Sequence, residues 1–103
     1  MIAFLEAPGF TARLQRYLDD AEYASLQWAL YLHPEAGALV PGSGGLRKLR
    51  WRGKGRGKSG GYRVIYYWRR RAGEIWMLTI YAKSEEQAIP AHVLRAIKEE
   101  MEE

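Results

Sequence analysis

A short basic stretch in the middle of the chain has the residue types needed to hold a polyanion. Its nine residues include five glycines and three cations, in the order Gly53-Lys54-Gly55-Arg56-Gly57-Lys58-Ser59-Gly60-Gly61. It runs into Tyr62-Arg63-Val64-Ile65-Tyr66-Tyr67-Trp68, whose β-branched and aromatic residues predict a strand. The pattern indicates a backbone-flexible, cationic approach to that strand.

The charge of the chain is concentrated around this stretch. The net charge is only +4, but no Asp or Glu lies between Glu35 and Glu74, an interval that holds eleven of the sixteen Lys and Arg residues. They are Arg47, Lys48, Arg50, Arg52, Lys54, Arg56, Lys58, Arg63, Arg69, Arg70 and Arg71. A solvated surface is the alternative for any charge run. The absence of acids favours phosphate binding, which gains affinity from counterion release.

The candidate site combines these cations with neighbouring aromatic residues. Arg63 is the most informative, because it stands in an apolar strand where Thr or Val is expected. The alternative for Arg63 is an edge strand whose outward cations discourage aggregation. The full candidate set for phosphate contact is Arg50, Arg52, Lys54, Arg56, Lys58, Arg63 and Lys83, with Tyr62, Tyr66 and Tyr81 available for base stacking.

Other chemistries fit the residues poorly. Gly57-Lys58-Ser59 ends like a P-loop, but the required first glycine is replaced by Arg52, and the segment leads into a strand rather than a helix. The two histidines, His33 and His92, have no carboxylate at ligand spacing, and the chain has no cysteine. The sequence predicts neither nucleotide hydrolysis nor a metal or other cofactor.

The elements that must position the site form one predicted domain over residues 1–103. In chain order we expect a strand at 2–5, a helix from residue 10, a helix opened by a capping box of Asp19 and Glu22, a loop at 36–45, strands at 46–52, 62–69 and 75–82, and a helix from Pro90. This β-α-α-β-β-β-α order predicts an α+β fold with a small twisted antiparallel sheet. We expect helices on one face and an open cationic surface on the other.

Alternation along the strands predicts which side chains share a face. In the strand at 46–52, Leu49 and Trp51 are expected on one face and Lys48, Arg50 and Arg52 on the other. In the strand at 75–82, we expect Trp76, Leu78 and Ile80 on one face, and Met77, Thr79, Tyr81 and Lys83 on the other. The two N-terminal helices carry Tyr17, Tyr23, Trp28 and Tyr31, a surplus of aromatic residues that favours an interface.

Location is indicated by what the sequence lacks. No apolar run approaches the ~18 residues of a membrane-spanning helix, and residues 1–6 do not have the pattern of a signal peptide. With no cysteine, the expectation is a cytoplasmic protein that does not contact membranes.

Three segments together resemble the RelE/HigB superfamily of bacterial type II toxins, most of all the HigB-like branch of RelE. They are Gly45-Leu46-Arg47-Lys48-Leu49-Arg50, then Gly55-Arg56-Gly57-Lys58-Ser59-Gly60-Gly61-Tyr62-Arg63-Val64-Ile65-Tyr66-Tyr67, then Leu78-Thr79-Ile80-Tyr81-Ala82-Lys83. The resemblance covers nearly the whole chain in element order. It implies a RelE-like fold and a ribosome-dependent mRNA endonuclease (mRNA interferase) that inhibits translation.

The resemblance also implies partners and site residues. The partners are the ribosome, mRNA and a cognate antitoxin of the helix-turn-helix, HigA-like kind, through which operator DNA is reached indirectly. Lys54 and Arg56 match the basic pair before the family's third strand, Arg63 matches its strand arginine, and Lys83 matches the basic position that ends the last strand. A terminal tyrosine of RelE falls at about Pro90 here, so its stacking role is absent or moved to Tyr81 or Tyr62.

Elementary RNA chemistry gives these residues provisional roles without a metal. Crowded cations lower one another's proton affinity, so Lys54 can serve as the base, with Arg56 or Lys58 beside it. The planar fork of Arg63 suits a phosphorane, and Lys83 is the candidate acid for the leaving oxygen.

Three alternatives remain at the level of sequence. One is a ParE-like toxin on the same scaffold that acts on gyrase, which the full basic cluster disfavours. The second is a non-catalytic basic RNA-binding module, for which a Gly/Arg-rich loop is equally natural. The third is a structural or interaction domain, which leaves the acid-free interval unexplained.

Overall fold

The computed structural model describes residues 1–53, 61–86 and 88–102. The predicted site residues Lys54, Arg56 and Lys58 lie outside these ranges. The elements are β1 (Ala3–Glu6), α1 (Pro8–Tyr17), α2 (Asp20–Leu32), β2 (Ala38–Leu39), β3 (Leu46–Trp51), β4 (Tyr62–Arg69), η1 (Arg70–Ala72), β5 (Glu74–Ala82) and α3 (Ala91–Glu102).

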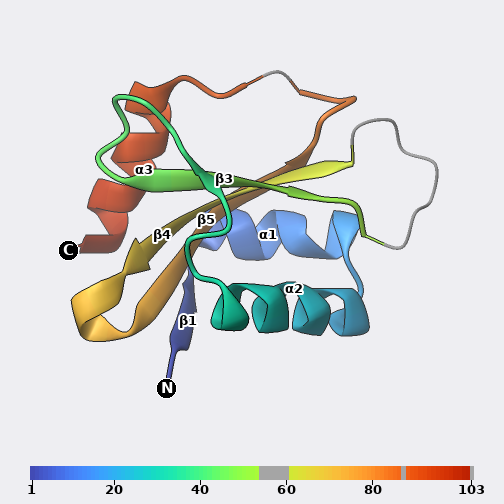
Figure 1. The fold of residues 1–103 in the computed structure, drawn as a ribbon. Helices are drawn as coiled ribbons and strands as arrows, with labels where there is room; N and C mark the ends of the chain where they lie inside the picture. Colours follow the sequence, from blue (N-terminus) through green and yellow to red (C-terminus); the bar gives the residue numbers. More distant parts are fainter. Residues whose placement is uncertain (54–60, 87, 103) are drawn as a thin grey trace.

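The strands form one five-stranded sheet in the order β1-β5-β4-β3-β2 (Figure 1). The α+β class predicted from the sequence is confirmed. The sheet is mixed rather than wholly antiparallel, because β1 pairs with β5 in parallel while the other neighbours are antiparallel. Two helices connect β1 to the next strand, and a connection of that length can join parallel as well as antiparallel strands. The predicted loop at 36–45 also contains the short strand β2.

The residues at their first turns explain where the two N-terminal helices begin. The helix α1 starts at Pro8, two residues earlier than expected, because a proline in the first turn loses no hydrogen bond. Thr11, in the first turn of α1, donates its hydroxyl to Glu6 Oε1 at 2.6 Å. The capping box of α2 is confirmed, since Asp19 Oδ1 accepts from the Glu22 N–H at 2.8 Å and Glu22 Oε1 accepts from the Asp19 N–H at 3.0 Å.

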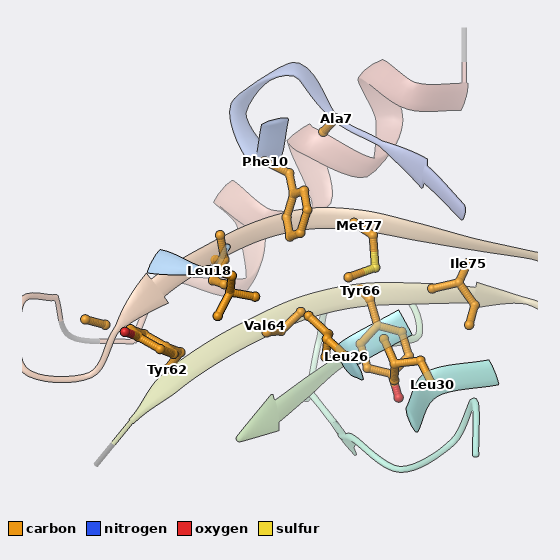
Figure 2. Close-up of a cluster of buried hydrophobic side chains, with 12 residues drawn as sticks. Ala7, Phe10, Leu18, Leu26, Leu30, Tyr62, Val64, Tyr66, Ile75 and Met77 are labelled. Atoms are coloured by element: carbon orange, nitrogen blue, oxygen red, sulfur yellow. The ribbon is translucent and has the colours of Figure 1, made fainter. Parts of the chain in front are cut away.

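The two N-terminal helices cover one face of the sheet, which we call the helix layer face. Figure 2 shows Phe10, Leu26 and Leu30 directed toward Tyr66 and Met77 of the sheet. Leu49 and Trp51 pack against the same cluster, as predicted. The buried Tyr66 hydroxyl donates to Pro34 O at 2.7 Å and accepts from the Gly37 N–H at 2.9 Å, which fixes the loop after α2 onto the strand.

The helix α3 packs on the opposite face, so the expectation of helices on one face only is wrong. Leu94 of α3 is buried in a second cluster with Leu46, Ile65, Trp76 and Leu78. Lys98 lies 4.4 Å over the ring of Tyr67 and adds a cation–π contact. The apolar stripe of α3 needs an apolar surface to bury, and the helix layer face is already occupied. The opposite face is therefore only partly open.

An irregularity in the pairing of β4 and β5 changes the predicted faces of β5. Ile65 pairs with Thr79 but Tyr66 pairs with Met77, which leaves Leu78 without a direct partner, as in a β-bulge. Beyond it, Ile80 and Ala82 join the helix layer face, whereas Tyr81 joins the α3 side together with Trp76 and Leu78. The predicted alternation from 76 to 82 was wrong because it assumed an unbroken period of two.

Candidate functional site

Arg63 lies on the α3 side of the central strand β4, beyond the apolar cluster that α3 covers. It shares this side with Ile65, whereas Val64 belongs to the helix layer face. Arg63 is only 8% exposed, and its Nη1 donates to the Tyr62 carbonyl at 3.3 Å. A guanidinium held this far from water interacts strongly with any negative group that reaches it.

Two further cations lie on the neighbouring strand. Arg50 of β3 is the cross-strand partner of Arg63, and Lys48 is the partner of Ile65. Arg50 is exposed and Lys48 is half-buried. The register therefore places two arginines opposite each other on neighbouring strands. Strand alternation predicted Lys48 on this face, but the predicted site did not include it.

Tyr81 of β5 flanks Arg63 on the other side, as its cross-strand partner. Its ring is 2% exposed. Burial raises the pKa of the Tyr81 hydroxyl, Arg63 opposes that rise and Glu86 adds to it. The hydroxyl therefore remains a neutral O–H donor at physiological pH. Buried as it is, Tyr81 presents little ring surface for base stacking.

Lys83 follows the end of β5 and reaches the start of β4. Its backbone N–H donates to Gly61 O at 3.0 Å, and the residue is exposed. Gly61 has φ +63° and a Cβ there would lie 2.8 Å from the carbonyl oxygen of Trp51, so only glycine allows this close approach. We call Lys48, Arg50, Arg63, Tyr81 and Lys83 the Arg63 cluster.

The other predicted tyrosines face away from this cluster. Tyr62 and Tyr66 belong to the helix layer face, and the Tyr62 ring packs 5.3 Å from the ring of Tyr17. Arg52, an exposed residue, directly follows β3. The stacking and phosphate-binding roles of Tyr62 and Arg52 stay predictions, as do the roles of Lys54, Arg56 and Lys58 beyond the described ranges.

Two acids that sequence reasoning did not place lie beside the cluster. Lys83, Ser84, Glu85, Glu86 and Ala88 line a hollow of about 570 Å³. The Glu86 carboxylate is held by Arg13 of α1 at 3.3 Å, and Glu85 Oε1 accepts from the Tyr17 hydroxyl at 3.0 Å. Glu86 also influences the pKa of Tyr81. The acid-free interval ends at Glu74 in the sequence, but folding returns these later acids to the site.

Two basic residues of the acid-free interval, Arg47 and Arg69, lie outside the Arg63 cluster and make structural contacts. Arg47 donates to the carbonyl oxygens of Glu35 at 3.1 Å and Gly37 at 2.8 Å. Arg69 lies 3.6 Å from Glu74 Oε1 and 5.1 Å from the ring centroid of Trp76. Arg47 and Arg69 therefore have structural partners within the described part of the chain.

Two other properties concern only the residues that the structure describes. Among them, no group of three or more His, Asp or Glu side chains is arranged to hold a metal ion. None of the helices in residues 1–53, 61–86 and 88–102 has the length and apolar character needed to cross a membrane.

A search of protein-family models finds no match to this chain. Among solved structures, the chain is similar to the free E. coli toxin RelE, in a form with two arginines replaced by alanine. The TM-score is 0.61 at 14% sequence identity, over 94% of this chain and 96% of that chain. At that identity the likeness shows the fold, so the predicted RelE-like architecture is confirmed. Membership of the HigB-like branch stays a prediction.

Proposed function

We propose that this protein is the toxin of a bacterial type II toxin–antitoxin system and cleaves mRNA on the ribosome. The observation that carries the proposal is Arg63, a nearly buried arginine opposed by Arg50 on one side and by the neutral hydroxyl of Tyr81 on the other. Two guanidinium groups on neighbouring strands suit a phosphate, because each planar fork can donate to two of its oxygens. The RelE-like fold supports the same function.

The proposed reaction is attack by the 2′-hydroxyl of RNA on its own phosphate. The 2′-oxygen forms a bond to phosphorus, the bond from phosphorus to the 5′-oxygen breaks, and that oxygen takes a proton. The products are a 2′,3′-cyclic phosphate on the upstream fragment and a free 5′-hydroxyl on the downstream fragment. No metal is required by this balance, because side chains can accept and donate both protons.

The residues of the Arg63 cluster have defined parts in this proposal. Arg63 stabilises the negative charge that develops on the phosphorane, aided by the Tyr81 O–H. Lys83 is the proposed acid for the leaving 5′-oxygen, because the residue is exposed and its backbone is bonded to Gly61, next to the start of β4. Lys54 is the proposed base, with Arg56 or Lys58 lowering its proton affinity; these three lie outside the described residues.

The described tyrosines support the proposed dependence on the ribosome. Base-specific RNA recognition uses exposed aromatic rings or groove-reading side chains. The described tyrosines near Arg63 do not supply such rings, since Tyr81 is 2% exposed and Tyr62 is 9% exposed. We therefore expect the RNA to be held and oriented by another macromolecule. We propose that the decoding site of the ribosome does so.

The test compares messenger in a purified translation complex with the same RNA free in solution. We expect cleavage only in the complex, with a 2′,3′-cyclic phosphate on the upstream product detected by mass spectrometry. Efficient cleavage of free RNA would remove the ribosome from the proposal, and a 3′-hydroxyl product would remove the 2′-hydroxyl attack. Inhibition of gyrase supercoiling without RNA cleavage would favour the ParE-like alternative. Tight RNA binding without cleavage would favour a non-catalytic module.

A further inference from the structure

The outer face of α2 carries apolar side chains that the fold does not use. Trp28 is 61% exposed, Tyr31 is 43% exposed and Leu32 is 51% exposed. Trp28 and Tyr31 stack on each other with centroids 5.4 Å apart and planes at 14°. The opposite side of the same helix is buried through Leu26 and Leu30. A helix that is apolar on both sides is expected to be covered on both.

The other surplus aromatic residues of the N-terminal helices are already engaged. Tyr17 packs against Tyr62 and donates to Glu85. Tyr23 lies 5.8 Å from Phe10 and donates to Glu6 Oε2 at 2.7 Å. The interface predicted for these helices from their aromatic content is thereby confined to the C-terminal half of α2.

A cavity continues this apolar surface toward the β4–β5 hairpin. It has a volume of about 620 Å³ and lies between Leu32, residues 33–36, Trp68 and Arg70. Leu32, Pro34 and Ala36 give it an aliphatic part, and its polar side chains come from His33, Glu35 and Arg70. An aliphatic part flanked by polar groups suits an apolar anchor side chain with polar neighbours from a protein.

Positive charge borders the cavity. Arg70 lines it, Arg71 is the next residue, and both are exposed. No ion pair joins either arginine to a residue of the described part of the chain, whereas Arg69 is engaged by Glu74. Glu35 is the one carboxylate residue among the cavity lining. A partner that enters here gains from carrying acidic side chains beside its apolar anchor.

We infer that Trp28, Tyr31, Leu32, Arg70 and Arg71, which we call the α2 patch, dock an acidic amphipathic segment of an inhibitory protein partner. This inference rests on the proposed function and adds the mode of regulation. Arg70 lies seven residues along β4 and η1 from Arg63, which at about 3.3 Å per strand residue places the two roughly 20 Å apart. A segment confined to the α2 patch therefore leaves the Arg63 cluster uncovered, and it inhibits by blocking entry into the ribosome.

The experiment measures binding of the purified product of the adjacent reading frame to the full chain by calorimetry, without ribosomes. We expect Trp28→Ala/Tyr31→Ala to weaken binding at least 100-fold, and Arg70→Glu/Arg71→Glu to weaken it at least tenfold with a smaller salt dependence. The matched controls are Val93→Ala and Arg95→Glu on the exposed side of α3, which should bind like wild type. Circular dichroism checks that each variant is folded.

A second readout tests where the partner lies. In the complex, acetylation of the exposed Lys83 should proceed as in the free chain, while photo-oxidation of Trp28 should be suppressed. Protection of Lys83, or loss of affinity on Arg50→Ala with the patch variants unaffected, would overturn the inference in favour of direct coverage of the site. Failure of wild type to bind the neighbouring product would overturn it as well.

Three further outcomes separate this inference from its alternatives. If the patch variants weaken binding of a 20-nucleotide single-stranded RNA but not of the protein, the α2 patch is an RNA surface and the inference is wrong. A chain that binds its partner through the patch but never cleaves mRNA would sink the proposed function and leave the docking surface. A chain that cleaves mRNA but binds its partner independently of the patch would sink the docking surface alone.

Discussion

The two faces of β4 share one backbone but differ in how their side chains are used. On the helix layer face, Tyr62, Val64 and Tyr66 all belong to a single core cluster under α1 and α2. On the α3 side, Ile65 and Tyr67 contact the cluster under α3, and the next position toward the start of the strand is Arg63. One face is uniform, and the other changes from apolar to cationic.

This difference separates stability from the proposed chemistry within one strand. The helix layer face and the part under α3 follow the ordinary rule that buried side chains are apolar. Arg63 departs from that rule, because it is charged and yet only 8% exposed. Local departures from the folding pattern are expected at functional sites, because stability there is exchanged for reactivity. The comparison predicts that changes on the two sides affect different measurements.

The largest expected effect comes from the apolar part of the α3 side. Leu94→Ala removes a buried side chain from the cluster with Ile65 and Trp76, and should lower the free energy of unfolding by about 2–5 kcal/mol. Urea denaturation measures this loss. Cleavage per folded molecule should stay within about twofold. The control is Val93→Ala on the same helix, where the side chain is 40% exposed and the expected loss is under about 0.5 kcal/mol.

The next largest effect is expected when the cationic part of the same side loses Arg63. Arg63→Ala should reduce ribosome-dependent cleavage about 10²–10³-fold, the usual cost of removing a charge-stabilising group from a transition state, about 2.7–4 kcal/mol. Arg63→Lys should recover only part of this rate, because an ammonium cannot bind two phosphate oxygens as a planar fork does. Expression without the partner should then no longer arrest bacterial growth. Full activity of a folded Arg63→Ala protein would remove Arg63 from the mechanism, with Arg95→Ala serving as the charge-matched control.

Sequence predicted the elements of this comparison better than their faces. Local signals gave the capping box of Asp19 and Glu22 and the strand at 62–69. These features depend on residues close in sequence. The parallel partner of β1 and the face chosen by α3 depend on which surfaces remain free after distant elements pack, and periodicity contains no such information.

The candidate site was predictable in composition but not in arrangement. The cations were identified from the acid-free interval, and Arg50 and Arg63 do lie opposite each other. The bulge at Leu78 was not predictable from alternation, and it determines that Tyr81 rather than Ile80 lies beside Arg63. The approach of Glu86 also escaped sequence reasoning, because Arg13 of α1 holds it from 73 residues away.

A smaller effect concerns the pH dependence of stability that arises from the buried tyrosines of the helix layer. Burial raises the pKa of Tyr23, with the Glu6 carboxylate adding to the rise, and burial also raises the pKa of Tyr66. The folded state therefore holds these protons more tightly than the unfolded state. This stabilisation is complete below the unfolded pKa of about 10 and is lost progressively above it.

We therefore expect the free energy of unfolding to fall above pH 10, with each such tyrosine contributing at most about 1.4 kcal/mol per pH unit. Tyr23→Phe should be less stable than wild type at pH 8 by about 1 kcal/mol, because it loses the hydrogen bond to Glu6. Its slope above pH 10 should nevertheless be shallower. Between pH 7 and 9 the slopes of the two proteins should coincide. Equal slopes above pH 10 would contradict a raised pKa for Tyr23.

The smallest expected effect distinguishes Arg50 from Arg63 within the Arg63 cluster. Arg50 opposes Arg63 across the ladder but is exposed to water, so a phosphate contact there is screened and contributes to binding rather than to the chemical step. Arg50→Ala should weaken binding of the translation complex about fivefold, reduce the slope of log affinity against log salt by about one, and leave the rate at saturation unchanged. Single-turnover kinetics over a salt series measures all three, with Arg95→Ala as the control. If Arg50→Ala instead lowered the saturated rate as much as Arg63→Ala, burial would not be what distinguishes the two arginines, and both would belong to the reacting centre.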